Sequence, residues 1–230
     1  MIRRKPLEWR RMRMHALAAF LLSASSAVSA PFAVQVGEAR IGLDAPPGFA
    51  DASFTGSPRL QELAESLTSA SNRVLLFALT DADLRRFTLG DQLELRRYMI
   101  AVTPRATERE RMTPSAFTAF AAESLRDLGA MPAPGDYRKY LESRPAGTIN
   151  VLGELRKDPD AVAVLLGARS KPTRYFEPSK YQLSSTSMLL LRGKPLTLSV
   201  YTQYDEPADL DWIRVTTARW IDELKRLNAR

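Results

Sequence analysis

Two unbroken apolar runs of strand length constrain the fold most strongly. The first extends from Arg73 to Leu79, and the second extends from Tyr98 to Val102 and stops at Pro104. A strand with one face in solvent alternates apolar and polar residues, so runs without alternation indicate strands that are buried on both faces. The chain is therefore expected to build a sheet with cover on each side.

Further strands are expected in pairs that are joined by short turns. The predicted pairs are 32–36 with 39–43 around Gly37-Glu38, 148–155 with 161–166 around 157–160, and 187–191 with 196–201 around Gly193-Lys194. These turn sequences are typical of hairpins, which make neighbouring strands antiparallel. The strand at 196–201 alternates apolar and polar residues, which indicates a position nearer an edge or a more open face.

Amphipathic segments predict helices that cover this sheet. The expected helices begin at Pro58, at Asp81, at Pro114 with an end at Gly129, and before Leu210 with an end near Leu227. The sequence therefore predicts the α+β class, with a mainly antiparallel central sheet covered by helices in a layered sandwich. A Rossmann-like fold requires regular alternation of strands and helices, and the late hairpins oppose it.

The first 30 residues have the three parts of a secretory signal peptide. Six basic residues come first, the apolar stretch Ala16 to Leu22 follows, and small residues fill 23–30. A membrane-spanning helix needs roughly 20 apolar residues, far more than this stretch contains. We expect cleavage after Ala27 or Ala30, which would leave one periplasmic domain at 31–230. The alternative is an uncleaved signal that anchors the chain in the inner membrane.

Basic charge is concentrated in the predicted signal peptide. The chain has a formal net charge of +7, but six of its 33 basic residues and one of its 26 acidic residues lie before residue 31. The remainder carries +2 and lacks the concentrated positive field that binding to a nucleic acid requires. We therefore expect no nucleic-acid partner.

The mature chain lacks the residues of several common catalytic mechanisms. Cysteine is absent, and His15 is the single histidine. This excludes thiol nucleophiles, Ser-His-Asp relays and the usual zinc, copper and haem ligands, and no cofactor is expected. The remaining catalytic alternative is a small hydrolase that uses Ser with Lys or paired carboxylates, although no lysine has a serine three residues before it.

Three stretches carry a resemblance to a known group of proteins. They are NRVLLFAL at 72–79, YMIAVTPR at 98–105, and SMLLLRGKPLTLSVYTQYDEPADLDWIRVTTARWIDEL at 187–224. These words resemble uncharacterised exported proteins of proteobacteria, and the order of elements resembles the PsbP-like sandwich. The resemblance implies an antiparallel sheet between helical layers and an accessory or binding role.

Acidic residues cluster where the last helix is expected to begin. They are Asp205, Glu206, Asp209 and Asp211. Calcium takes oxygen ligands, but the spacing lacks the central glycine and closing glutamate of a calcium-binding loop. A helix N-terminus attracts carboxylates, so we expect a structural role and no metal site. Trp212 lies off the apolar stripe of this helix and is expected to pack against the segment that leads into it rather than against a partner.

The connection from Arg169 to Gln182 is the candidate binding segment. Long loops within a tightly connected domain commonly carry binding residues, and here basic residues alternate with aromatic ones. The candidate residues are Lys171, Arg174, Tyr175, Lys180 and Tyr181. The segment from Asp136 to Arg144 has a similar composition. The alternative for both is a solvated loop whose rings pack on the sheet.

These observations together predict an exported accessory protein without catalytic activity. Its expected partner is a protein of the bacterial envelope or an anionic envelope component. After cleavage of the signal peptide, no stable membrane anchor is expected.

Overall fold

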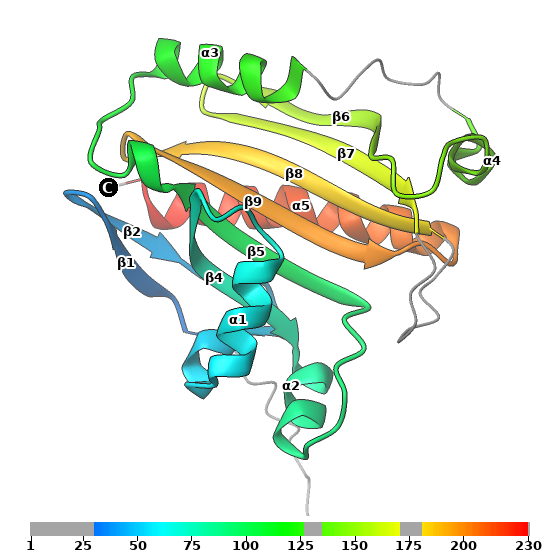
Figure 1. Ribbon diagram of the computed structural model, residues 1–230. Helices are drawn as coiled ribbons and strands as arrows, with labels where there is room; N and C mark the ends of the chain where they lie inside the picture. Colours follow the sequence, from blue (N-terminus) through cyan, green and yellow to red (C-terminus); the bar gives the residue numbers. More distant parts are fainter. Residues whose placement is uncertain (1–29, 127–134, 171–180, 230) are drawn as a thin grey trace, which may run out of the picture.

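The computed structural model describes residues 30–126, 135–170 and 181–229. A seven-stranded sheet forms its centre, and helices pack on both faces of this sheet (Figure 1). The strand order is β3-β4-β5-β9-β8-β7-β6. The strands are β3 (Phe49–Asp51), β4 (Asn72–Thr80), β5 (Arg97–Pro104), β6 (Asn150–Asp158), β7 (Ala161–Arg169), β8 (Tyr181–Leu191) and β9 (Lys194–Gln203). All six pairings are antiparallel, so the predicted α+β class with an antiparallel sheet is confirmed.

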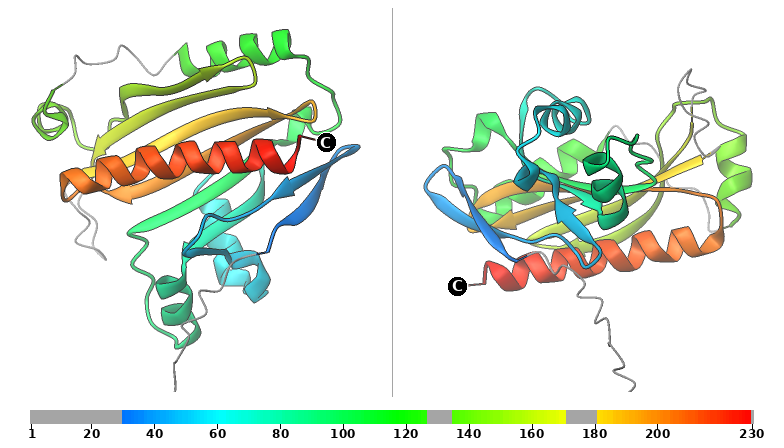
Figure 2. Two further views of the ribbon diagram at one scale, coloured as in Figure 1. Left: turned by 180° about the vertical axis from the view of Figure 1, so that it is seen from behind. Right: turned by 90° about the horizontal axis from the view of Figure 1, so that it is seen from below.

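Helix α5 (Pro207–Leu227) crosses one face of the sheet, and the hairpin of β1 (Phe32–Val36) and β2 (Ala39–Leu43) lies beside it (Figure 2). The largest core cluster joins the apolar stripe of α5 to this sheet face and to the hairpin. Trp220, which is 2% exposed, packs in this cluster and donates through Nε1 to the backbone oxygen of Asp44 over 2.8 Å. Each large apolar side chain buried here contributes about 1.5–3 kcal/mol of transfer free energy.

The opposite face carries shorter helices in two groups. Helices α1 (Pro58–Ser66) and α2 (Asp81–Thr88) cover β4 and β5, whereas α3 (Pro114–Leu125) packs on β8 (Figure 1). Phe117 of α3 and Met188 of β8 belong to one buried cluster. The remaining elements are α4 (Tyr137–Glu142) and the 3-10 turns η1 (Ala52–Thr55) and η2 (Arg105–Thr107). Within the described ranges, no helix combines the length and hydropathy that crossing a bilayer requires.

The turn of the last hairpin lies one residue earlier than predicted. Arg192 and Gly193 form it with φ angles of 52° and 77°, so both turn residues have the positive φ of a type I′ turn. Lys194 belongs to β9, where it is buried and its Nζ donates to the backbone oxygens of Glu108 (2.8 Å) and Glu110 (2.5 Å). The lysine therefore ties the segment after β5 to this hairpin.

Two further expectations about the last hairpin are corrected. Strand β9 is the central strand of the sheet rather than an edge strand, so only the predicted alternative of a more open face remains. Its apolar residues pack toward α5, and its polar residues point to the other face of the sheet. Strand β8 begins at Tyr181, well before the predicted start at Ser187. Its early residues include Ser185, a buried serine whose hydroxyl lies 2.6 Å from that of Thr217 on α5.

Candidate functional site

A cleft of about 690 Å³ lies where the ends of β8 and β9 meet α4. Its volume lies within the usual range of ligand pockets, which is about 300–1,000 Å³. Both signs of charge and two tyrosines line it. The lining residues are Asp136, Arg138, Lys139, Glu142, Tyr181, Tyr204 and Asp205.

Asp136 fixes the start of α4 and thereby places the basic residues of the cleft. Its Oδ1 accepts hydrogen bonds from the backbone N–H groups of Arg138 (3.0 Å) and Lys139 (3.2 Å), as an N-cap does. The Arg138 guanidinium lies 4.9 Å from the ring centroid of Tyr204. The same guanidinium donates to the Tyr204 backbone oxygen over 3.4 Å, so α4 is joined to the end of β9.

The two tyrosines form the floor of the cleft. The backbone N–H of Tyr204 donates to the backbone oxygen of Tyr181 over 2.9 Å, and each residue is 7% exposed. Burial raises the pKa of Tyr204, and the nearby Arg138 charge offsets only part of that rise. The Tyr204 hydroxyl is therefore neutral at physiological pH and can donate a hydrogen bond.

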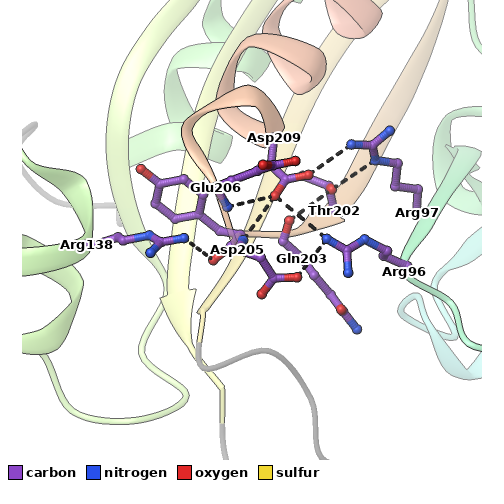
Figure 3. A network of polar contacts seen from close by, with 9 residues as sticks. Arg96, Arg97, Arg138, Thr202, Gln203, Asp205, Glu206 and Asp209 are labelled. Atoms are coloured by element: carbon purple, nitrogen blue, oxygen red, sulfur yellow. Dashed lines mark hydrogen bonds and ion pairs between the residues drawn. The ribbon is translucent and has the colours of Figure 1, made fainter.

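A buried carboxylate holds the segment between β9 and α5 in place (Figure 3). Asp209 accepts from Arg97 Nη2 over 2.9 Å and from the backbone N–H groups of Asp205 (3.0 Å) and Glu206 (3.1 Å). Burial opposes ionisation of this carboxyl group, but the three donors outweigh it and hold the pKa of Asp209 below its ordinary value. Arg96 completes the network through an ion pair with Asp205 at 2.7 Å.

The acidic cluster has the structural role that the sequence predicts at Asp209. Glu206 is the N-cap of α5, and Asp209 in its first turn accepts the Glu206 backbone N–H. For Trp212, the contacts that the structure shows are with elements other than the predicted segment leading into the helix. Its ring lies 4.2 Å from the Arg97 guanidinium carbon and 6.1 Å from the Phe49 ring, so it packs on β3 and β5.

The structure places one of the five predicted binding residues. Tyr181 lies in this cleft, but as the first residue of β8 rather than as part of a loop. The other four, Lys171, Arg174, Tyr175 and Lys180, lie outside the described residues. The second basic and aromatic segment supplies α4, so the described ends of both segments meet at one cleft.

Sequence reasoning missed the arginines that organise this region. Arg97 is the first residue of the buried strand β5, and Arg96 directly precedes it. Nothing local indicates that they pair with acids more than 100 residues later. The sequence shows Asp209 near the start of a helix, but the burial that makes this acid need a positively charged partner is visible only in the structure.

A second cavity, of about 450 Å³, lies between α5 and the segment that follows β2. Trp220, Pro46 and Pro47 contribute apolar surface, and Asp44, Asp222 and Glu223 contribute carboxyl groups. Burial raises the pKa of Asp44, and the Glu223 charge adds to the rise. The hydrogen bond from Arg226 holds the pKa of Glu223 below its ordinary value. Asp44 and Glu223 therefore differ in proton affinity.

Among the residues that the structure describes, no group of three or more acidic, histidine or cysteine side chains is placed to hold a metal ion.

Comparisons with known proteins give one structural likeness. No family model and no curated protein sequence matches the chain significantly. Its structure is similar to the crystal structure of the Ran-binding protein Mog1p of Saccharomyces cerevisiae, with 12% sequence identity and a TM-score of 0.37. The match covers 88% of this chain and 94% of that chain. At this TM-score the likeness supports no conclusion, and the α+β class rests on the strand pairing itself.

Proposed function

We propose that this chain is a non-catalytic binding protein of the bacterial periplasm that recognises an envelope protein through the cleft between α4 and the ends of β8 and β9. The observation that carries this proposal is the convergence of Tyr181, Tyr204 and two basic side chains of α4 in one cleft. Tyrosine and arginine are enriched at protein interfaces, where they combine apolar contact with hydrogen bonding.

The mixed charge of the cleft favours a protein over a polyanion. Asp136, Glu142 and Asp205 line the same cleft as Arg138 and Lys139. An anionic envelope component would meet repulsion from these carboxylates, whereas a protein surface can present both signs of charge. We therefore propose a protein partner, and the crosslinking test below would reveal an anionic component if that were the partner instead.

The proposed periplasmic localisation depends on the predicted signal peptide. A basic opening, a short apolar stretch and small residues before Pro31 support export, as does the resemblance to exported proteobacterial proteins with a PsbP-like order of elements. N-terminal sequencing of protein from a periplasmic extract is expected to give a chain that begins at residue 28 or 31. Full-length protein in the membrane fraction would indicate the uncleaved anchor instead.

Photocrosslinking in intact cells tests the binding role. A benzophenone amino acid at position 139 places the probe in the cleft, and the same amino acid at position 157 on β6 serves as the control, because both lysines are exposed. We expect a discrete protein adduct from position 139 that position 157 does not give. Identical adducts from both positions, or adducts with an anionic glycolipid alone, would contradict recognition of a protein through the cleft.

One observation favours a second candidate, a hydrolase with paired carboxylates. Asp44 and Glu223 line one cavity, where burial raises the pKa of Asp44 and the hydrogen bond from Arg226 lowers that of Glu223, and an acid and a base of a hydrolase require such a difference. Hydrolysis of a panel of chromogenic glycosides and esters, lost on Asp44→Asn, would favour this candidate. No turnover above that of the Asp44→Asn variant would remove it.

A further inference from the structure

One edge of the central sheet is left largely without a strand partner. Strand β3 pairs with β4 only from Ala78 to Thr80, and the chain then turns away into η1. The Oδ1 atom of Asp51 accepts the backbone N–H of Phe77 over 3.2 Å and so ends the pairing. In the part of the sheet that the structure describes, β4 continues back to Asn72 with no strand on this side.

A cavity of about 660 Å³ lies along this unpaired edge, beneath α1. Its apolar wall is formed by Leu60, Ala64, Val74, Leu75 and Phe77. Its polar rim includes Ser57, Gln61, Glu65, Thr68, Asn72, Arg73 and Arg105, and Gln61 Nε2 donates to Glu65 Oε1 over 3.1 Å. An extended peptide suits such a cavity, because its backbone can pair with a strand edge while alternate side chains enter the apolar part.

Asp51 and Arg105 lie at opposite ends of the cavity, and Glu65 of α1 also lines it. Asp51 lies at the Phe77 end, where it is 2% exposed. At the Asn72 end, Arg105 donates through Nε to the Asn72 backbone oxygen over 3.0 Å. Arg105 is exposed and makes no ion pair with a described residue, whereas Arg73 is already paired with Glu108 at 2.9 Å. The positive charge of Arg105 is therefore available to a ligand.

These charges select one orientation of an added strand. A peptide antiparallel to β4 continues the direction of β3, so its N-terminal end lies near Phe77 and its C-terminal end lies near Asn72. Its last carboxylate then lies beside Arg105, while its N-terminal N–H groups lie beside Asp51. A parallel peptide would place its carboxylate beside Asp51 and is disfavoured by repulsion.

We propose that the cavity beneath α1 binds the C-terminal end of an extended peptide, which adds to β4 as an antiparallel strand with its free carboxylate at Arg105. This site lies on other strands than the cleft at the ends of β8 and β9, and it does not depend on that cleft.

Strand β6 forms the opposite edge of the sheet, and its features protect that edge from pairing with another strand. Strand β6 has two register shifts and carries Glu154, Arg156, Lys157 and Asp158. Bulges and charges of this kind block edge-to-edge pairing. Strand β4 has a single register shift at Leu75, and it carries no charged side chain from Val74 to Leu79. The β4 edge is thus the one whose side chains permit pairing.

The test uses acetylated hexapeptides in which Val, Ile, Leu or Phe alternates with Ser or Thr. One pool ends in a free carboxylate, a second ends in an amide, and a third has the free carboxylate but N-methyl groups on alternate residues. Binding is followed by fluorescence anisotropy and by hydrogen exchange of the segment from Asn72 to Thr80. We expect slower exchange with the first pool, about fivefold weaker binding on amidation and at least tenfold weaker binding on N-methylation.

Matched variants connect the binding to this cavity. Arg105→Glu is expected to remove the preference for the free carboxylate, whereas Arg109→Glu, an exposed arginine outside the cavity, keeps it. Gln61→Trp narrows the mouth of the cavity and is expected to abolish binding. Glu62→Trp, on an exposed position of α1 that does not line the cavity, leaves binding intact and controls for folding.

Three results would overturn the proposal. The first is unchanged hydrogen exchange of β4 when the free-carboxylate pool is present at about 1 mM, a concentration at which even a weak peptide site would be occupied. The second is equal binding of the N-methylated pool, because a strand edge requires backbone donors. The third is equal binding to the Gln61→Trp and Glu62→Trp variants, which would place the peptide elsewhere.

Discussion

The Arg97 guanidinium donates to the buried Asp209 carboxylate over 2.9 Å and thereby joins β5 to the first turn of α5. The carboxylate is almost fully inaccessible to solvent, whereas the arginine side chain is 31% exposed. A buried carboxylate is stable only when its charge is compensated by nearby donors. This pair therefore couples the position of α5 to the sheet and to the adjacent cleft.

Removing the charge of Asp209 is expected to destabilise the protein substantially. Asp209→Asn leaves Arg97 without its anionic partner and replaces one acceptor oxygen by an NH₂ group. Loss of one member of a buried pair costs about 3–5 kcal/mol, and partial exposure of the arginine reduces this to about 2–4 kcal/mol. Urea unfolding measures the loss. Asp211→Asn, at an exposed position of the same helix, is the control and is expected to change the unfolding free energy by no more than about 0.5 kcal/mol.

The contribution of Asp209 is expected to depend on pH. Its pKa is lower in the folded protein than its ordinary value of 3.8, so the unfolded chain binds the proton more tightly. The stabilisation is therefore complete above the ordinary pKa and is lost as pH falls through the lowered pKa of the folded state. The difference in unfolding free energy between the wild type and Asp209→Asn should be constant near neutral pH and shrink below about pH 4. A difference that grew on acidification would contradict this assignment.

Asp44 is expected to show the opposite dependence on pH. Burial raises its pKa, so the folded protein holds this proton more tightly than the unfolded chain does. The unfolding free energy therefore falls as pH rises above 3.8 through the raised pKa. Asp44→Asn removes this loss of unfolding free energy and should raise the melting temperature at pH 7 relative to wild type. Asp91→Asn, at an exposed position, should leave the melting temperature unchanged. A lower melting temperature for Asp44→Asn would show that its charged form is stabilised in the fold.

The turn between β1 and β2 is expected to tolerate only glycine. Gly37 has a φ of 56°, and an added Cβ would collide with the backbone oxygen of Glu108. Gly37→Ala should therefore cost about 2–4 kcal/mol in thermal or chemical unfolding, because both the turn and the contact with the segment after β5 are strained. Gly153→Ala is the matched control, since nothing lies within 4 Å of its added Cβ. Equal stability of the two variants would contradict the close approach at Gly37.

The sequence predicts most elements because their signals are local. The hairpin at residues 32–43 has the predicted bounds, since Gly37 interrupts two short runs of strand-forming residues. Strand β8 begins before the predicted Ser187 and includes the polar residues Ser184 and Ser185. Ser185 is buried in a strand because its hydroxyl pairs with Thr217, which lies 32 residues later and on another element. Local periodicity contains no information on such a pair.

The candidate site depends even more on distant contacts. The alternation in β9 indicates one less covered face, but it does not tell a central strand from an edge strand. The cleft requires Arg138 to lie over Tyr204, 66 residues later, and β3 and η1 were not predicted although they define the cavity beneath α1. The sequence indicated two basic and aromatic segments, and only the fold brings α4 and Tyr181 together.

Binding of the crosslinked partner to purified variants tests the proposed function most directly. Lys139→Glu reverses one charge inside the cleft, and Lys157→Glu makes the same change on exposed β6. Calorimetric titration with the partner identified from position 139 is expected to show at least tenfold weaker binding for Lys139→Glu and unchanged binding for Lys157→Glu. Equal affinity of both variants and the wild type would contradict recognition through the cleft between α4 and the ends of β8 and β9.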